Sequence, residues 1–394
     1  MNIILFDTAF RKKLFPLTLT RAVADLRVGI LTIKERWEKL MGTKVFLLTE
    51  DYLQPLYEEA FGAAYIFIDA SVIPNFELVN AIQGLQTGQG IKDDKGVVAY
   101  KTLSKVIPSI DKVSSNLSIA FETLPVKRLS FLFDLFQCNQ QMIELDFALI
   151  TNGRTSADLD NTVHLLQPSR VFVEEGAVVS HSILNASSGP IYIGKNATIM
   201  EGCLIRGPFA ICEGAVLKMG TKIYGATTIG PYSMGGGEIK NSIITGYSNK
   251  AHDGYLGDSV IGEWCNMGAG TSNSNLKNTG GTVHLWDYES KEFLPSGNKC
   301  GVVMGDYSRT AINSSINTGS VIGVCSNVFG DGLLPKFIPD FSWGVVQESR
   351  YRFDKAINDI NNWKKMKNKT ITEKETQVLK HIFDLVISKS SKQV

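Results

Sequence analysis

The chain has 394 residues, with 40 Lys and Arg against 39 Asp and Glu, so its net charge is only +1. This balance excludes a basic field over the whole chain that would attract nucleic acid or a membrane surface. A composition of 44% hydrophobic and 20% charged residues also excludes a disordered chain. A single core stops growing near about 250–300 residues, so we expect at least two domains.

The cysteines and the N-terminus indicate the compartment. The six cysteines are scattered and form no CxxC pair, which is unlike a disulfide framework or a zinc site. The apolar run at Met1–Phe6 is too short for a signal peptide, and no stretch approaches the roughly 20 apolar residues of a transmembrane helix. We therefore expect a cytoplasmic protein with buried, reduced thiols.

Residues 1–150 alternate strand-like and helix-like patterns. Apolar residues recur at helical spacing from Ile30 to Met41 and from Phe76 to Leu85. Short apolar or β-branched runs, typical of buried strands, lie at Ile3–Phe6, Val45–Leu48, Ile66–Ile68 and Val97–Tyr100. The alternation predicts an α/β, Rossmann-like domain with a largely parallel sheet. A connector and the first turn of a second domain follow over residues 151–186.

Glycine and a six-residue repeat define the middle of the chain. Residues 187–332 hold 26 of the 36 glycines, about twice an even share. Every sixth residue from Ile193 is aliphatic, and a small residue usually follows four positions later. The first run is Ile193, Ile199, Ile205, Ile211, Leu217, Ile223 and Ile229; Ile243 and Ile261 resume it after a phase shift, and Met304, Thr310, Ile316, Ile322 and Val328 form a second run.

Three hexapeptides make one turn of a prism with short strands as its faces, so each aliphatic residue stacks on its equivalent 18 residues later. The repeat resembles that of left-handed parallel β-helices, and we expect this domain over residues 187–334. The repeat lapses near residues 276–300, which predicts a projecting loop. Residues 335–394 form a helical tail, with helices near Tyr351–Met366 and Thr372–Ser388 and a capping-box spacing from Thr372 to Glu375.

One segment of the coil has an unusual set of polar residues. It reads His252-Asp-Gly-Tyr255-Leu-Gly-Asp258 and continues to Asn266-Met-Gly-Ala269-Gly-Thr. The pattern resembles the acetyltransferase half of the bifunctional bacterial enzyme family that makes UDP-N-acetylglucosamine. Members of that family join a glucosamine-1-phosphate acetyltransferase to an N-acetylglucosamine-1-phosphate uridyltransferase.

The resemblance implies a role for each matching residue. Acetyl transfer from a thioester to an amine needs a base for the ammonium proton, and neutral imidazole titrates in the right range. His252 is implied as that base and Asn275 as a donor to the developing oxyanion. Lys222 and Lys240 are implied to hold the sugar phosphate, Tyr255 and Asn266 to place the sugar, and the backbone near Ala269 to approach acetyl-CoA. The resemblance also implies a homotrimer that binds acetyl-CoA between neighbouring coils.

The N-terminal domain resembles sugar nucleotidyltransferases less closely. Arg11 and Arg21 stand near the positions of the two basic residues that contact nucleotide and sugar phosphates, but the glycines of the phosphate-binding loop are absent. Asp69, at the end of a strand, is the candidate ligand for Mg²⁺ in uridylyl transfer from UTP. An Asp that accepts hydrogen bonds from loop amides explains the same position equally well.

The sequence is consistent with three functions. The first is synthesis of UDP-N-acetylglucosamine by acetyl transfer to glucosamine-1-phosphate and then uridylyl transfer. The second is acetyl transfer alone, with a degenerate N-terminal domain, which the missing glycines favour. The third is a non-catalytic trimeric scaffold that binds sugar nucleotides.

Overall fold

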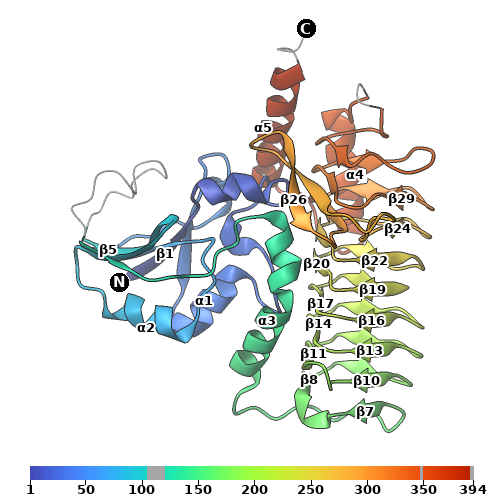
Figure 1. Cartoon of the computed structure of the whole chain (residues 1–394), viewed down its shortest axis with the longest axis horizontal. Coiled ribbons are helices and arrows are strands. Elements are labelled where there is room, and N and C mark those ends of the chain that lie inside the picture. Colours follow the sequence, from blue (N-terminus) through green and yellow to red (C-terminus); the bar gives the residue numbers. More distant parts are fainter. Residues whose placement is uncertain (104–119, 347–348, 391–394) are drawn as a thin grey trace. The chain divides into compact units, whose positions relative to one another are not determined.

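The structure is a computed structural model that describes residues 1–103, 120–346 and 349–390 (Figure 1). It divides into two compact units. The first comprises residues 1–14, 18–26 and 31–132, and the second comprises residues 15–17, 27–30 and 133–394.

The first unit is built on a six-stranded sheet in the order β2-β1-β3-β5-β4-β6. Its strands are β1 (Asn2–Phe6), β2 (Val45–Leu48), β3 (Tyr65–Asp69), β4 (Gln89–Asp93), β5 (Gly96–Thr102) and β6 (Ala120–Thr123). β1 pairs in parallel with β2 and β3, and β4 pairs in parallel with β6. β5 is antiparallel to both neighbours, so the sheet is mixed rather than largely parallel. The α/β class is as predicted, but apolar runs alone do not give strand direction.

Two helices of this unit begin at side-chain caps. α1 (Ile33–Met41) has a full capping box between Thr32 and Glu35, and it ends at Gly42 in the left-handed conformation. α2 (Phe76–Gly84) begins where the Asn75 side chain accepts a bond from Leu78 N. Both helices lie where the apolar spacing predicts them.

The second unit contains a parallel β-helix with three faces, which confirms the predicted hexapeptide-repeat fold. Face 1 consists of β7 (His164–Leu166), β10 (Ile183–Asn185), β13 (Leu204–Arg206), β16 (Lys222–Tyr224), β19 (Glu238–Lys240) and β22 (Tyr255–Gly257). Face 2 consists of β8 (Val171–Val173), β11 (Ile191–Ile193), β14 (Phe209–Ile211), β17 (Thr227–Ile229), β20 (Ile243–Gly246), β23 (Val260–Glu263), β27 (Val302–Met304), β30 (Ser320–Ile322) and β32 (Phe337–Ile338). Face 3 consists of β9 (Val178–Val179), β12 (Thr198–Ile199), β15 (Val216–Leu217), β18 (Met234–Gly235) and β21 (Asn249–Lys250). The pairs β24 (Ser272–Asn273) with β29 (Ser315–Ile316), and β28 (Arg309–Thr310) with β31 (Asn327–Val328), belong to the later coils.

The repeat residues fill the inside of this prism. Ile193 pairs with Ile211, and Ile211 pairs with Ile229, each 18 residues apart, and all are fully buried. One predicted position is wrong. The next inward residue is Ile244 rather than Ile243, because Ile229 pairs with Ile244 and the coil between them is shorter.

Helix α3 (Leu132–Thr151) packs on the coil, so the second compact unit includes the chain from residue 133 onward. The buried Asn139 amide accepts a bond from Gly29 N (2.7 Å) and donates to Ala226 O (2.9 Å). Asp146 accepts a bond from Ile30 N (2.9 Å). These bonds join α3 and the segment 27–30 to the coil near β17.

The interruption and the tail follow the prediction. β25 (Val283–Asp287) and β26 (Glu292–Gly297) form an antiparallel hairpin between coils. The tail contains α4 (Phe353–Lys365) and α5 (Glu373–Ser390), and Thr372 and Glu375 exchange both bonds of the predicted capping box.

Aromatic residues stack along the corner between faces 2 and 3. Tyr232, Tyr247 and Trp264 share the left-handed backbone conformation, with φ of 56°, 53° and 58°. Their rings stack in turn at 5.2 Å and 4.4 Å between centroids. Lys364 of α4 lies 5.2 Å from the Trp264 ring and pairs with Glu375 of α5, so the tail is attached to this corner.

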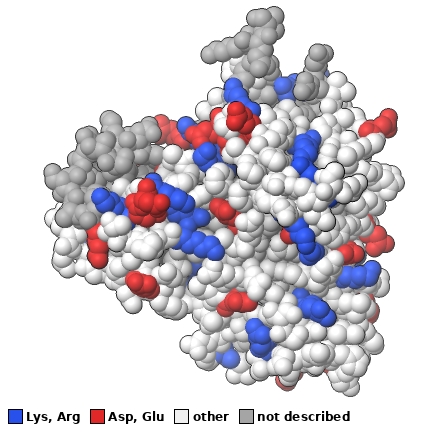
Figure 2. Space-filling view, viewed as in Figure 1, with Lys and Arg blue, Asp and Glu red and all other residues white. Residues whose placement is uncertain are grey.

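The surface shows no dominant charge in the view of Figure 2, where basic and acidic side chains are interspersed among large uncharged areas. Of the helices that the structure describes, none is long and apolar enough to cross a bilayer.

Candidate functional site

Face 1 carries a cluster of polar side chains at the end formed by β16, β19 and β22. In the register of the neighbouring strands, Lys222 lies opposite Glu238, and Glu238 lies opposite Tyr255, so these three residues lie in one row. Tyr224 and Lys240 form the neighbouring row. Alternate residues of a strand point to opposite faces, so both rows face outward while the residues between them fill the core.

Contacts within the cluster order the side chains. The Tyr224 hydroxyl donates to the Glu238 carboxylate, and this bond raises the pKa of Tyr224 to about 12. The Lys240 ammonium lies 5.8 Å from the centre of the Tyr224 ring. Lys222 is exposed on the same surface. Two cations and one carboxylate therefore share a face that is open to a charged ligand.

Tyr255 is fixed by a second set of bonds. The Asn275 amide donates to the Tyr255 hydroxyl (3.0 Å) and to the Asp258 carboxylate, which also accepts a bond from Asn241 (2.7 Å). A Cβ atom at Gly257 would lie 2.2 Å from the Tyr255 hydroxyl oxygen. Only glycine therefore leaves room for this position of the tyrosine ring.

His252 lies at the next corner, between faces 3 and 1. Its side chain is exposed, and the corner packs directly on the glycines of the preceding coil. A Cβ at Gly236 would lie 2.3 Å from Ala251 O, and one at Gly237 would lie 2.9 Å from His252 O. The glycines of Met234-Gly-Gly-Gly237 thus make room for the histidine corner.

Asn266 and Ala269 lie apart from the face 1 cluster. The backbone of Asn266 forms parallel β-bridges with Asn249 and Arg309, which places Asn266 in line with face 3. Ala269 occupies the corner one coil after that of His252, and the two corners are joined by the bond from Gly270 N to Asp253 O (3.1 Å). Within one chain, the structure thus brings together Lys222, Lys240, Tyr255 and Asn275 on face 1, with His252 at the adjoining corner.

Sequence reasoning missed three contributors to this site. Tyr224 could have been found, because it lies two residues after Lys222 in the same outward register. Asp258 was visible only as part of the Tyr-Leu-Gly-Asp motif. Lys250 points inward at a position of the aliphatic row, so no search for aliphatic repeats would find it.

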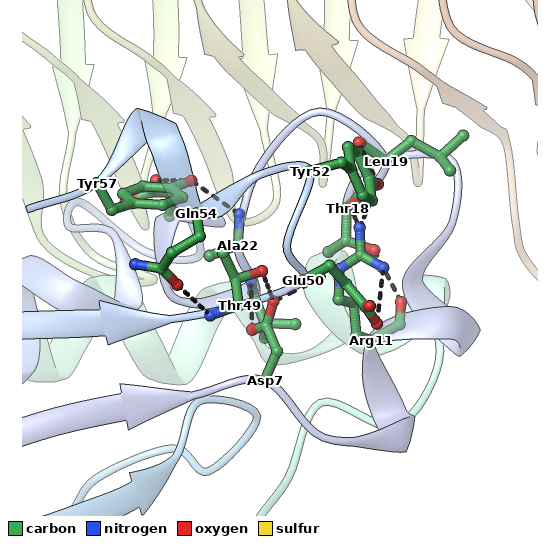
Figure 3. A network of polar contacts seen from close by, with 12 residues as sticks. Asp7, Arg11, Thr18, Leu19, Ala22, Thr49, Glu50, Tyr52, Gln54 and Tyr57 are labelled. Carbon is green, nitrogen blue, oxygen red and sulfur yellow. Dashed lines mark hydrogen bonds and ion pairs between the residues drawn. The ribbon is translucent and has the colours of Figure 1, made fainter. Parts of the chain in front are cut away.

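In the first unit, Arg11 is a buried residue with its own partners (Figure 3). Its guanidinium donates to Thr18 O (2.6 Å) and to the Tyr52 hydroxyl (2.5 Å). It also lies 3.5 Å from the Asp7 carboxylate and 3.7 Å from that of Glu50. The guanidinium that the sequence assigns to a nucleotide phosphate is therefore engaged inside the protein.

The partners of Arg11 belong to a wider buried network. Asp7 accepts bonds from Val23 N (3.0 Å) and from the Thr49 hydroxyl (2.6 Å), and burial raises its pKa to about 7. Arg21 is half-buried nearby. Burial raises the pKa of Asp25, and the charge of Arg21 opposes that rise. The loop after β1 is thus held by its own side chains.

Asp69, the predicted magnesium ligand, is buried in an ion-pair network. Arg128 pairs with Asp69 and also with Asp93 at 2.7 Å, and all three side chains are at most 3% exposed. Asp69 also accepts bonds from Thr8 and Ser71 N. Among the described residues, no group of three or more His, Cys, Asp or Glu could hold a metal ion. The surroundings of Asp69 therefore do not fit a magnesium site.

Comparison with known proteins places the chain in a class. Residues 3–155 match the family of sugar nucleotidyl transferases. The bifunctional protein GlmU of Synechococcus elongatus is 26% identical over 262 residues, which cover 62% of this chain and 53% of that protein. GlmU of Methanococcus maripaludis is 30% identical over 191 residues, covering 48% and 41%. The chain thus spans about a third to a half of the length of the relatives that it matches.

One solved structure, that of the polysialic-acid-specific acetyltransferase NeuO, aligns with 52% of this chain and 90% of its own. The TM-score of this alignment is 0.24 and the sequence identity is 14%.

The fold and the family match define a protein that joins a sugar nucleotidyl transferase domain to a parallel β-helix. In particular, the chain resembles the bifunctional GlmU proteins, from which its sequence has diverged widely.

Proposed function

We propose that the second unit transfers the acetyl group of acetyl-CoA to the amine of glucosamine-1-phosphate. The observation that carries the proposal is the face 1 cluster, where Lys222 and Lys240 stand beside Tyr255 next to the His252 corner. Two ammonium groups on one open surface suit a sugar phosphate, and an exposed imidazole beside them suits a base for the amine proton.

The roles follow from this placement. Lys222 and Lys240 attract the phosphate, and Tyr255 places the sugar ring. His252 takes the proton that the amine loses as its nitrogen attacks the thioester carbon. The C–S bond then breaks, and the protonated His252 returns that proton to the departing sulfur, so CoA leaves as the thiol. Asn275 already donates to Tyr255 and Asp258, so we assign it to holding Tyr255 in position. It would reach an oxyanion only by giving up one of these bonds.

The corner near Ala269 is the proposed approach for acetyl-CoA, because its residues Gly268-Ala269-Gly270 are small and it adjoins the His252 corner. Asn266 lies in line with face 3, whereas Tyr255 lies on face 1. A ligand that contacts both residues would either extend around the corner between these faces or contact Tyr255 of one subunit and Asn266 of another. This is consistent with the proposed homotrimer.

For the first unit we favour loss of nucleotidyl transfer. The buried, engaged guanidinium of Arg11 and the ion pair of Asp69 with Arg128 support this version over a second active site. Uridylyl transfer to N-acetylglucosamine-1-phosphate is the competing candidate, and the match of residues 3–155 to sugar nucleotidyl transferases favours it.

One set of assays separates these possibilities. The full-length protein is incubated with acetyl-CoA and glucosamine-1-phosphate, and the free thiol of CoA is measured. We expect release that His252→Ala reduces at least 100-fold, within the range of general-base contributions. His164→Ala is the matched control, because His164 is exposed on face 1 at its opposite end. No release by the unaltered protein would favour a non-catalytic scaffold, and pyrophosphate released from UTP would show that the first unit is active.

A further inference from the structure

Lys250 is a lysine inside the β-helix. In the strand register of face 3, Lys250 lies opposite Gly235 of the preceding coil, and Gly235 lies opposite Leu217 of the coil before that one. Leu217 and Ile199, the inward residues of this row in earlier coils, are aliphatic members of the core. Lys250 is 3% exposed. The chain thus places an amine where the repeat otherwise places a hydrocarbon.

The coil makes room for this side chain and gives its amine two partners. Gly235 contributes no side chain to the row beneath the lysine. The Lys250 ammonium donates to Gly236 O (3.0 Å) and to His252 O. Both carbonyls belong to the corner structure around His252: Gly236 lies under the corner, and His252 is part of it.

We propose that Lys250 is a positioning residue that fixes the backbone of His252 from inside the coil. A methionine or leucine here would fill the core without desolvating an amine, but it would have nothing to donate to His252 O. The lysine ties the histidine corner to the coil beneath it. Its importance for catalysis rests on the proposed function, whereas its effect on the position of His252 does not.

The position of His252 can be observed directly. The chain has five histidines, so full-length protein labelled with ¹³C at the histidine Cε1 atoms gives five imidazole signals. His252→Ala identifies one of them. We expect Lys250→Met to shift or broaden the His252 signal and to leave the other four unchanged.

Two further variants keep the test decisive. Leu217→Met, a substitution of similar volume in the same inward row, should leave all five signals in place. Lys250→Gln retains an N–H donor and should give a smaller change than Lys250→Met; it also serves if the methionine variant does not fold. An unchanged His252 signal in a folded Lys250→Met protein overturns the proposal. A change in all five signals also overturns it, because the lysine would then support the coil in general.

Kinetics provide the second readout. If His252 is the base, Lys250→Met should lower kcat for acetyl transfer by about 10- to 100-fold and leave KM for acetyl-CoA near its original value, since a misplaced base slows the reaction more than it weakens binding. A loss confined to KM would contradict the assignment. If the unaltered protein transfers no acetyl group, the proposed function fails while the imidazole signals still decide the role of Lys250.

Discussion

Replacing Lys250 with methionine should change how the stability of the β-helix depends on pH. Burial lowers the pKa of Lys250 to about 8, and the nearby carboxylate of Asp253 only partly opposes this effect. At pH 7 the lysine is charged in both the folded and the unfolded chain, so the folded protein bears the full cost of a buried charge. As the pH rises above 8, the folded state releases the proton before the unfolded state does. Stability due to this residue therefore increases with pH up to about 10.5.

The magnitude follows from the two pKa values. A fall from the ordinary value of 10.5 to about 8 corresponds to about 3 kcal/mol. The free energy of unfolding of the unaltered protein, measured relative to Lys250→Met, should thus rise by about 3 kcal/mol between pH 7 and pH 10.5. The ammonium donates stronger bonds to Gly236 O and His252 O than the neutral amine does, and the pKa of the folded state already includes this difference, so it needs no separate correction.

Urea denaturation followed by tryptophan fluorescence measures the difference. Four of the five tryptophans (Trp264, Trp286, Trp343 and Trp363) lie in the second unit, so the signal reports mainly on the unit that contains Lys250. Leu217→Met serves again as the control and should show no such dependence. A Lys250→Met difference that stays constant from pH 7 to pH 10.5 would refute the reasoning, because the amine would then not be desolvated in the folded protein.

Three more predictions address other parts of the molecule. Arg128→Met removes the cation that pairs with the buried Asp69 and Asp93 carboxylates and should destabilise the first unit by about 3–5 kcal/mol at pH 7. The loss should shrink as the pH falls, because the variant's carboxylates take up protons more readily once the cation beside them is gone; urea denaturation that shows equal losses at pH 7 and pH 4 would contradict this. Ile211→Ala should cost about 2–5 kcal/mol and lower the urea midpoint of the second unit, whereas a loss under 1 kcal/mol would mean that the inward row is loosely packed. Gly257→Ala displaces the Tyr255 ring and should raise KM for the sugar phosphate by roughly 2- to 10-fold. Gly246→Ala is the control and should leave this KM unchanged, because the atom nearest to a Cβ added at Gly246 is 3.4 Å away.

The β-helix was predictable because its packing repeats along the chain. Each inward residue stacks on an equivalent 18 residues away, so a strict spacing reports a three-dimensional contact directly. The prediction failed at Ile243, where a shorter coil moved the inward position to Ile244. It also missed Lys250, because the inward row was defined by aliphatic residues.

The first unit was less predictable because its decisive contacts are distant in the sequence. Arg128 lies 59 residues from Asp69, and no local pattern connects them. The same holds for Arg11, whose half-buried partner Tyr52 lies 41 residues away. Basic and acidic residues near a strand end thus look alike in the sequence whether they face a ligand or each other.

The most direct test of the central claim is the pH dependence of acetyl transfer. If His252 is the general base, kcat/KM for CoA release should rise with pH on the acid side of the profile, because a protonated imidazole cannot accept the proton of the amine. His252→Ala should lose both the rate and this rise. A variant that keeps the same pH profile as the unaltered protein, even at a reduced rate, would show that another group accepts the proton.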